Sequence, residues 1–453
     1  MKKQYPLAPA FGEEQHSKEL KAISDILDQH PEIAELAQQD LTRGRRSKAG
    51  RKGMSGEQAI RVALLKQIHA HSYRELRFHL GDSATFRAFS RMPFGMPIKL
   101  QTLQSNVKRL RPATWEALNH ALLKDAEAAG IETGRRTRTD CTAVESNIHE
   151  PSDSSLLWDC VRVVTRIINR AIEAFPGEDW SFFHDRSRRA KRRAFEIKFP
   201  PRKGDKTKQR EAAYRDLLEA TKETYAYGLI AEAKIRALKP TSIEDALKLG
   251  AWADELRGHL ESTVQVMGQT RRRVIEGEKV PAREKLMSIF EKHTDIIIKD
   301  QRDTFFGHKV CLTGGASSLI LDCVIEDGNP ADSTLVKRSI ERQKEIYGRA
   351  PRQASFDGGF ASKDNLKAAK ELGVKDAAFH KKCGLEITDM VKSAWVFKRL
   401  RNFRAGIEGC ISTLKRAFRM DRCTWRGLEG FKSYVWASVV SFNLIALARC
   451  LHT

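Results

Sequence analysis

Three acidic residues that lie far apart in this chain occupy positions from which a carboxylate could act on a bound ligand. Asp140 lies in a β-branched segment, Asp357 ends a short apolar run before two glycines, and Glu408 lies in a basic helix. The end of a strand is where a side chain can project into an open crevice. Three converging carboxylates would repel one another without cations between them, and Mg²⁺ binds carboxylate together with phosphate oxygens. The pattern therefore predicts a divalent-metal site for phosphoryl transfer.

The segment around Glu408, RNFRAGIEGCISTLKRAF, predicts a helix that is charged on one face and apolar on the other. The charged face carries Arg401, Arg404, Glu408 and Lys415. A surface pair of Arg404 with Glu408 would contribute only about 0.2–1 kcal/mol. The two glycines that flank Glu408 each cost a helix roughly 1 kcal/mol relative to alanine. We therefore interpret the glycines as clearance for a bulky chain, and Arg404 and Lys415 as contacts for its phosphates.

Asp357 has a simpler alternative interpretation, because Asp-Gly is a common turn pair. Its role depends on the elements that surround it. The expected order is a strand in 135–148, helices in about 155–300, a hairpin in 304–328 turning at Gly314-Gly315, a helix from Ser333 to Gly348, a strand ending at Asp357, a helix capped by Ser362, a strand in 374–382 and the Glu408 helix. Without the helical insertion, this is the order of a ribonuclease H-like fold in the mixed α+β class.

The N-terminal part of the chain is predicted to be helical with a basic arm. Ser55 with Gln58, and Ser72 with Glu75, form capping boxes before apolar residues at helical spacing. Further helices are expected from Asp82 or Ser83, and from Thr102 to Arg111. The arm has six bases and no acid in 41–52, and its candidate DNA-binding residues are Arg45, Arg46, Lys48, Arg51 and Lys52. Short basic helices favour a helix-turn-helix-like DNA-binding domain, and a plain dimerisation module fits the pattern nearly as well.

These patterns divide the chain into four parts. They are an N-terminal segment in 1–40, a helical DNA-binding or dimerisation domain with its basic arm in 41–130, a catalytic core in 131–153 and 301–453, and a helical insertion in 154–300. The insertion contains a second basic segment, 184–210, with twelve bases. This segment predicts either a solvated linker or an arm that contacts DNA.

The net charge of +22 indicates a polyanionic partner, because each base set against a phosphate releases condensed counterions. Nucleic acid is the first candidate and an anionic membrane the second. The apolar run 433–451 is interrupted by serines and an asparagine, so we expect a buried helix and no membrane span. The eight cysteines include no C-x-x-C pair, and the first residues lack the apolar core of a signal peptide. We expect a cytoplasmic, nucleoid-associated protein without zinc.

Taken together, the motifs resemble those of the DDE transposases of bacterial insertion sequences. Members of this family carry a first Asp on a strand, a second Asp before small residues and an aromatic, and a Y-x2-R-x3-E-x6-K signature. The second motif here reads FDGGF, and the third runs from Arg404 through Glu408 to Lys415 with its spacing intact. Arg401 replaces the tyrosine. The blocks DCTAVESNIHEPSDSSLLWD, FFGHKVCLTGG and EDGNPADSTL are similar to those of one subgroup, the ISNCY group.

The resemblance implies a catalytic triad of Asp140, Asp357 and Glu408 that binds Mg²⁺ or Mn²⁺. It implies cleavage at the terminal inverted repeats of a mobile element and joining of the freed 3′ ends to target DNA. The partners would be double-stranded DNA and a second copy of the chain, as a homodimer on DNA. Two other functions stay open: a catalytically silent DNA-binding repressor derived from a transposase, and a structure-specific nuclease on the same fold.

Overall fold

The computed structural model describes residues 9–44, 53–202, 204–240, 242–299, 303–380 and 383–451. The chain forms two compact units. The first unit combines residues 1–147 with 297–453, and the second contains residues 148–296. The sequence placed the insertion at 154–300.

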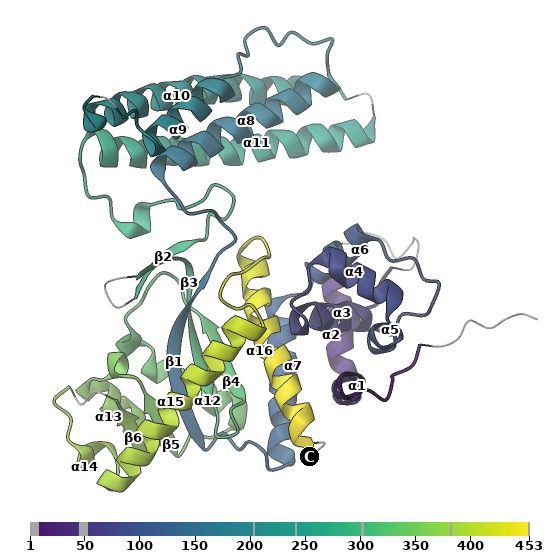
Figure 1. Cartoon of the computed structure of the whole chain (residues 1–453), viewed down its shortest axis with the longest axis vertical. Helices are drawn as coiled ribbons and strands as arrows, with labels where there is room; N and C mark the ends of the chain where they lie inside the picture. The colour runs from purple at the N-terminus through teal and green to yellow at the C-terminus, as the bar shows by residue number, and fades with distance from the viewer. Residues whose placement is uncertain are drawn as a thin grey trace, which may run out of the picture. The chain divides into compact units, whose positions relative to one another are not determined.

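A mixed six-stranded sheet forms the centre of the first unit (Figure 1). Its strands are β1 (Arg136–Glu145), β2 (Asp295–Lys299), β3 (Asp303–Gly314), β4 (Ile320–Ile325), β5 (Gln353–Phe356) and β6 (Asp376–Phe379). The path across the sheet is β2-β3-β1-β5-β6, and β4 also pairs with β3. β1 is antiparallel to β3 and parallel to β5, and β5 is parallel to β6. The predicted mixture of helices with a sheet of parallel and antiparallel strands is therefore confirmed.

Four helices of the C-terminal half accompany the sheet. They are α12 (Val336–Tyr347), α13 (Lys363–Glu371), α14 (Ile387–Met390) and α15 (Ala394–Ala417). α15 packs against β1 and β5 and crosses the sheet in Figure 1. The predicted stop at Gly348 is confirmed, since this residue is left-handed with φ 66° directly after α12. The predicted cap at Ser362 is confirmed as well, because its hydroxyl accepts a hydrogen bond from the Asn365 amide.

The N-terminal helices belong to the same unit. They are α1 (Gln15–Asp28), α2 (Pro31–Thr42), α3 (Gly56–Ile68), α4 (Tyr73–Asp82), α5 (Ala84–Phe89), α6 (Leu100–Val107) and α7 (Pro112–Ala128). Both capping boxes are confirmed at the starts of α3 and α4, and Ser83 caps α5. The predicted helix from Thr102 to Arg111 is wrong in its extent. α6 ends at Val107, and Pro112 opens α7, where its missing N–H has no partner to lose.

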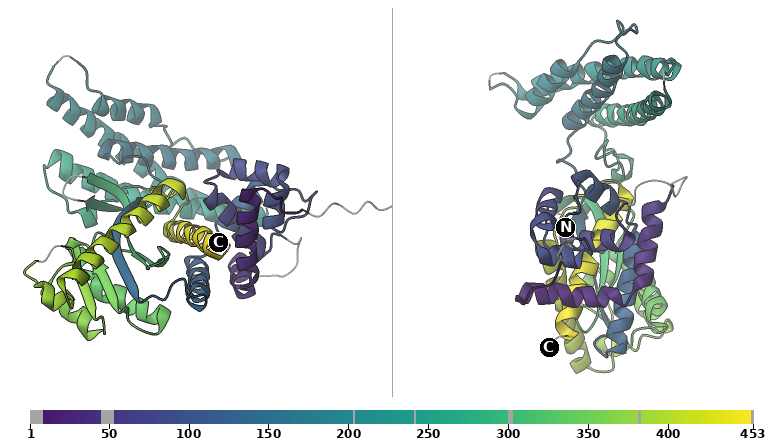
Figure 2. Two further views of the ribbon diagram at one scale, coloured as in Figure 1. Left: turned by 60° about the horizontal axis from the view of Figure 1, so that its bottom comes forward. Right: turned by 90° about the vertical axis from the view of Figure 1, so that its right-hand side faces the viewer.

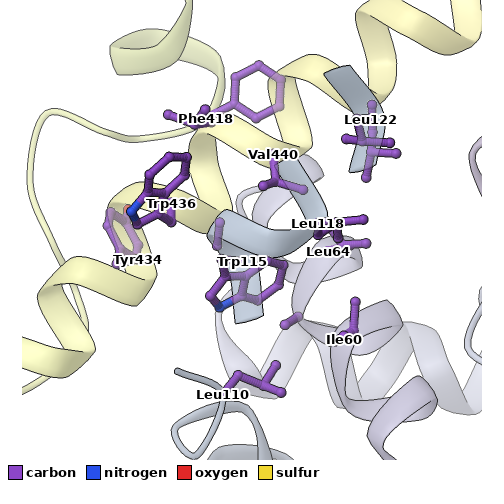
Figure 3. Packing of buried hydrophobic residues seen from close by; sticks show 14 of the residues in the cluster. Ile60, Leu64, Leu110, Trp115, Leu118, Leu122, Phe418, Tyr434, Trp436 and Val440 are labelled. Atoms are coloured by element: carbon purple, nitrogen blue, oxygen red, sulfur yellow. The ribbon is translucent and has the colours of Figure 1, made fainter. Parts of the chain in front are cut away.

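The last helix, α16 (Leu428–Leu451), packs into this core. It contacts α7, α3, α1 and β4, and it lies beside α7 in Figures 1 and 2. Figure 3 shows Val440 of α16 near Trp115 and Leu118 of α7 and Leu64 of α3. α16 is long and apolar enough to cross a membrane, yet 67% of its most apolar window is buried inside the protein. It therefore has the character of a core helix.

The second unit contains four long helices, drawn in blue to teal in Figure 1. They are α8 (Asp153–Ala174), α9 (Ser187–Lys198), α10 (Lys206–Ala237) and α11 (Ile243–Thr270). A solvated linker is wrong for the basic segment, because residues 187–198 form α9 and pack against α8 and α10. Arg189 pairs with Asp216 at 2.5 Å and with Glu223 at 2.8 Å. Part of the basic charge of this segment is thus balanced inside the unit.

Candidate active site

The strand register brings Asp140 and Asp357 next to each other on two adjacent strands. Thr139 of β1 lies opposite Phe356 of β5, and these two strands run parallel. The next residue along each strand is Asp140 and Asp357 respectively. Asp140 lies inside β1, with its side chain 17% exposed, and Asp357 directly follows β5, with its side chain 40% exposed. Two acids separated by a large insertion therefore become neighbours.

Arg404 of α15 contacts all three predicted catalytic acids. Its Nη1 lies 3.2 Å from Asp140 Oδ2 and 3.3 Å from Asp357 Oδ1. Its Nη2 pairs with Glu408 Oε1, one helical turn further along α15. Because both oxygens contact the same nitrogen, Asp140 Oδ2 and Asp357 Oδ1 cannot be further apart than the sum of these two distances. A single guanidinium holds the predicted triad together.

The position of Arg404 differs from the one the helical wheel gave. The wheel placed Arg404 on the outer, charged face as a phosphate contact, but the residue is only 8% exposed. α15 packs against β1 and β5, which brings Arg404 into contact with Asp140 and Asp357. Glu408 stays open to solvent, with its side chain 60% exposed. Glu408 therefore lies on the exposed side of α15, whereas Arg404 is buried among the carboxylates.

The donor set of this cluster suits a hard divalent cation. All three acids offer carboxylate oxygens, which are the protein ligands that Mg²⁺ prefers. In this structure the three carboxylates contact one positive group, the guanidinium of Arg404. Within the described ranges, no group of three or more His, Cys, Asp or Glu side chains has the spacing of a metal site.

The two glycines of α15 have different surroundings. A Cβ on Gly406 would overlap the Arg138 guanidinium, whereas a Cβ on Gly409 would meet open space. Arg138 donates to the Phe403 carbonyl at 3.0 Å and to Ser318 Oγ at 2.9 Å. The clearance at Gly406 is therefore filled by an arginine of β1. The interpretation of both glycines as clearance for a bound chain is wrong for Gly406, and only Gly409 has open space beside it.

A cavity of about 610 Å³ contains the acid cluster. Lys415 also lines this cavity, half-buried on α15. Two further charged residues that the sequence did not single out, Lys309 and Asp332, line it too. Lys309 Nζ lies 2.5 Å from Asp332 Oδ1 and donates to the Pro330 carbonyl at 2.7 Å. Both residues lie within the blocks FFGHKVCLTGG and EDGNPADSTL, whose similarity to a transposase subgroup could have pointed to them.

Gly359 explains how Asp332 approaches the site. A Cβ at Gly359 would lie only 2.9 Å from Asp332 Oδ2, so the second glycine after Asp357 leaves room for this fourth carboxylate. Arg401, the residue at the tyrosine position of the signature, is exposed on α15. The arm residues Arg45, Arg46, Lys48, Arg51 and Lys52 lie outside the described residues.

The site thus gathers carboxylates from β1, from the end of β5 and from α15 around one arginine. Residues 269–444 match the family model of the transposase DDE domain. Residues 269–444 therefore carry a transposase DDE domain, in agreement with the predicted family, and the ISNCY subgroup stays a prediction. The match contains Asp357 and Glu408, and Asp140 precedes it across the helical unit. No curated protein and no solved structure matches the chain.

Proposed function

We propose that this protein is a transposase that binds the terminal inverted repeats of its mobile element, cleaves the DNA ends and joins the 3′ ends to target DNA. The observation that carries the proposal is the contact of Arg404 with Asp140, Asp357 and Glu408 inside one cavity of a transposase DDE domain. We also propose that the mixed sheet with its helices is a ribonuclease H-like core, which would fit the same function.

Asp140, Asp357 and Glu408 would hold Mg²⁺ or Mn²⁺. Two such ions, when bound, activate the attacking oxygen and stabilise the leaving oxygen of a phosphodiester. The residues of the chain position the carboxylates that would hold these ions. Asp140 is fixed by its strand, and its Oδ1 accepts a hydrogen bond from the Cys141 amide at 2.8 Å, which leaves Oδ2 toward the cavity. Glu408, exposed at the mouth, is the acid with most freedom to move.

Arg404 and Lys415 are the cations of α15 that would contact the substrate in this cavity. A bound phosphate offers Arg404 a planar, bidentate partner, which a guanidinium binds well. Transfer of Arg404 from the carboxylates to a phosphate would release the acids for the metal. The excess of basic residues in the chain would strengthen binding of the DNA ends. We propose that the protein acts as a homodimer on DNA. We also propose that it is cytoplasmic and associated with the nucleoid.

The test compares wild-type protein with Asp357→Asn on DNA that carries the inverted repeats flanking its own gene, in Mg²⁺. We expect Asp357→Asn to lower cleavage by at least about 100-fold, since even the outer partners of metal ligands typically contribute 10–100-fold. Asp364→Asn, an exposed aspartate in the first turn of α13, is the matched control and should cleave normally. Equal cleavage by Asp357→Asn and wild type would refute the metal-site assignment.

The same assay separates the two other functions. A silent repressor would bind the ends with strong salt dependence, and Mg²⁺ would produce no cleavage by the wild type. A structure-specific nuclease would cut DNA without the repeats equally well, and it would join no 3′ end to a target. Cleavage restricted to the repeats, followed by joining, supports the transposase.

A further inference from the structure

A second polar cavity lies away from the acid cluster, at the junction of α3 and α4 with the segment that follows α15. Its volume is about 500 Å³. The side chains that decide its chemistry are Lys66, His71, Arg74, Glu75, Arg419 and Tyr434. We call it the α3–α4 cavity. Neither the triad nor the basic arm accounts for it.

Lys66, in the last turn of α3, is the unusual residue of this cavity. It is only 7% exposed, and its ammonium lies 5.0 Å from the centre of the Tyr73 ring. Among the residues that the structure describes, no carboxylate lies within ion-pairing distance of its nitrogen. Burial, reinforced by the charge of Arg419, lowers the pKa of Lys66 to about 8. A buried cation of this kind is expensive to maintain in a fold, which favours a functional reason.

The remaining charges of the α3–α4 cavity are mostly positive. Arg74 and Arg419 are exposed at its rim, and His71 is half-buried. The single acid of the lining, Glu75, accepts a hydrogen bond from the Ser72 amide at 2.7 Å in the capping box. This bond is the main reason that the pKa of Glu75 lies below its usual value. Glu75 is therefore engaged, and the cavity presents an excess of cations.

The backbone at Arg419 is held in an unfavourable conformation that keeps this residue at the cavity. Its φ is 52°, a left-handed value that costs a side chain other than glycine or asparagine about 1 kcal/mol or more. Two contacts hold the segment: Tyr434 Oη donates to the Arg419 carbonyl at 2.7 Å, and Gln67 Nε2 donates to the Phe418 carbonyl at 2.5 Å. The N-terminal helix α3 and the end of the catalytic helix thus meet at one cationic cavity.

We propose that the α3–α4 cavity binds a phosphate group, and that this group is a phosphodiester of the DNA bound by the protein. The inference rests on the proposed function, because it assigns a second contact for the same DNA. From Glu408 to the end of α15 at Ala417 the helix covers roughly 14 Å at about 1.5 Å per residue. That length corresponds to about four nucleotides of one strand at about 3.4 Å each. One duplex could therefore reach both sites.

The experiment measures DNA affinity, its salt dependence and thermal stability for Lys66→Met. Inverted-repeat duplex is titrated without divalent ions, so that cleavage plays no part. We expect Lys66→Met to bind about tenfold more weakly, with a salt slope smaller by about one, because one phosphate contact is lost. Its melting temperature should stay equal or rise, because a buried unpaired charge is removed. Lys367→Met, on an exposed lysine of α13, is the matched control and should bind normally.

Arg419→Gly keeps the inference testable if Lys66→Met folds poorly. Glycine tolerates a φ of 52° without strain, so this variant removes the cation and relaxes the backbone. It should also bind DNA several-fold more weakly while keeping its melting temperature. Equal affinity and an equal salt slope in both variants and wild type would overturn the inference while leaving the proposed function intact. Failure of the wild type to bind the duplex would instead reject the proposed function.

Inorganic phosphate distinguishes the two sources of the anion. If phosphate raises the melting temperature of the wild type but not of Lys66→Met, and DNA affinity is the same in both, the cavity binds a free anion. That result would overturn the assignment to DNA. Competition of inorganic phosphate with duplex in the wild type, absent in Lys66→Met, supports it.

Discussion

The contact of Arg404 with the three acids makes a quantitative prediction about Arg404→Gln. The substitution removes the cation and leaves a shorter, neutral polar side chain. At the largest separation that its contacts allow, about 6.5 Å, the Asp140 and Asp357 oxygens would repel by about 2.5 kcal/mol at an effective dielectric constant of about 20. Asp357 is 40% exposed, so solvent screening lowers this repulsion. Glu408, at 60% exposure, adds less than about 1 kcal/mol.

We therefore expect Arg404→Gln to destabilise the first unit by about 1–3 kcal/mol in EDTA at neutral pH. In thermal unfolding this corresponds to a shift of a few degrees, since about 1 kcal/mol moves the midpoint by roughly 2–4 °C in a domain of 150–250 residues. Millimolar Mg²⁺ should restore more stability to the variant than it adds to the wild type, because an ion no longer competes with the guanidinium. The size of this gain follows the ratio of ion concentration to its dissociation constant.

Three controls make the Arg404 result decisive. KCl at matched ionic strength separates specific metal binding from screening. Arg401→Gln, an exposed arginine on the same helix, should leave stability and its Mg²⁺ response unchanged. Combining Arg404→Gln with Asp357→Asn should recover most of the lost stability, because the repelling pair is gone. A gain from Mg²⁺ in Arg404→Gln that is no larger than in the wild type would refute the competition between arginine and metal.

Two further predictions concern stability. Gly406→Ala should destabilise the protein by about 1–3 kcal/mol, because its methyl group displaces the buried Arg138 guanidinium from its hydrogen bonds. Gly409→Ala should stabilise the protein by about 0.5–1 kcal/mol, because its methyl group meets open space and alanine favours the helix. Chemical denaturation of both variants checks this, and equal effects would reject the packing role of Gly406. Burial lowers the pKa of His69 to about 4. The unfolded chain therefore binds a proton at this histidine more readily than the folded chain does. The free energy of unfolding should fall by up to about 3 kcal/mol as the pH drops from 6.5 to 4. The His69 ring stacks on Phe86 with 5.0 Å between the ring centres, and the ring of His69→Phe can do the same. This variant should therefore lose less melting temperature between pH 6.5 and 4 than the wild type. An equal loss in both proteins would show that other groups cause the acid destabilisation.

Local signals in the sequence were sufficient wherever a short segment settles its own structure. The capping boxes at Ser55 and Ser72 and the left-handed stop at Gly348 depend on backbone groups within a few residues. The helix that ends at Val107 was overestimated for a local reason too. Pro112 fits the first turn of the next helix as well as it ends the previous one. Proline position alone therefore did not locate that helix end.

The sequence by itself determined which acids the chain offers, their order, and the spacing of Arg404 and Glu408 on one helix. Only the tertiary structure decided what faces them. Asp140 and Asp357 become neighbours through the parallel register of β1 with β5, a pairing across the whole helical unit that no local pattern encodes. The same packing turns Arg404 from a surface residue into the shared partner of three carboxylates, and it fills the space beside Gly406 with Arg138. Helical periodicity gives the direction of a side chain, whereas its partners depend on which strand the helix crosses.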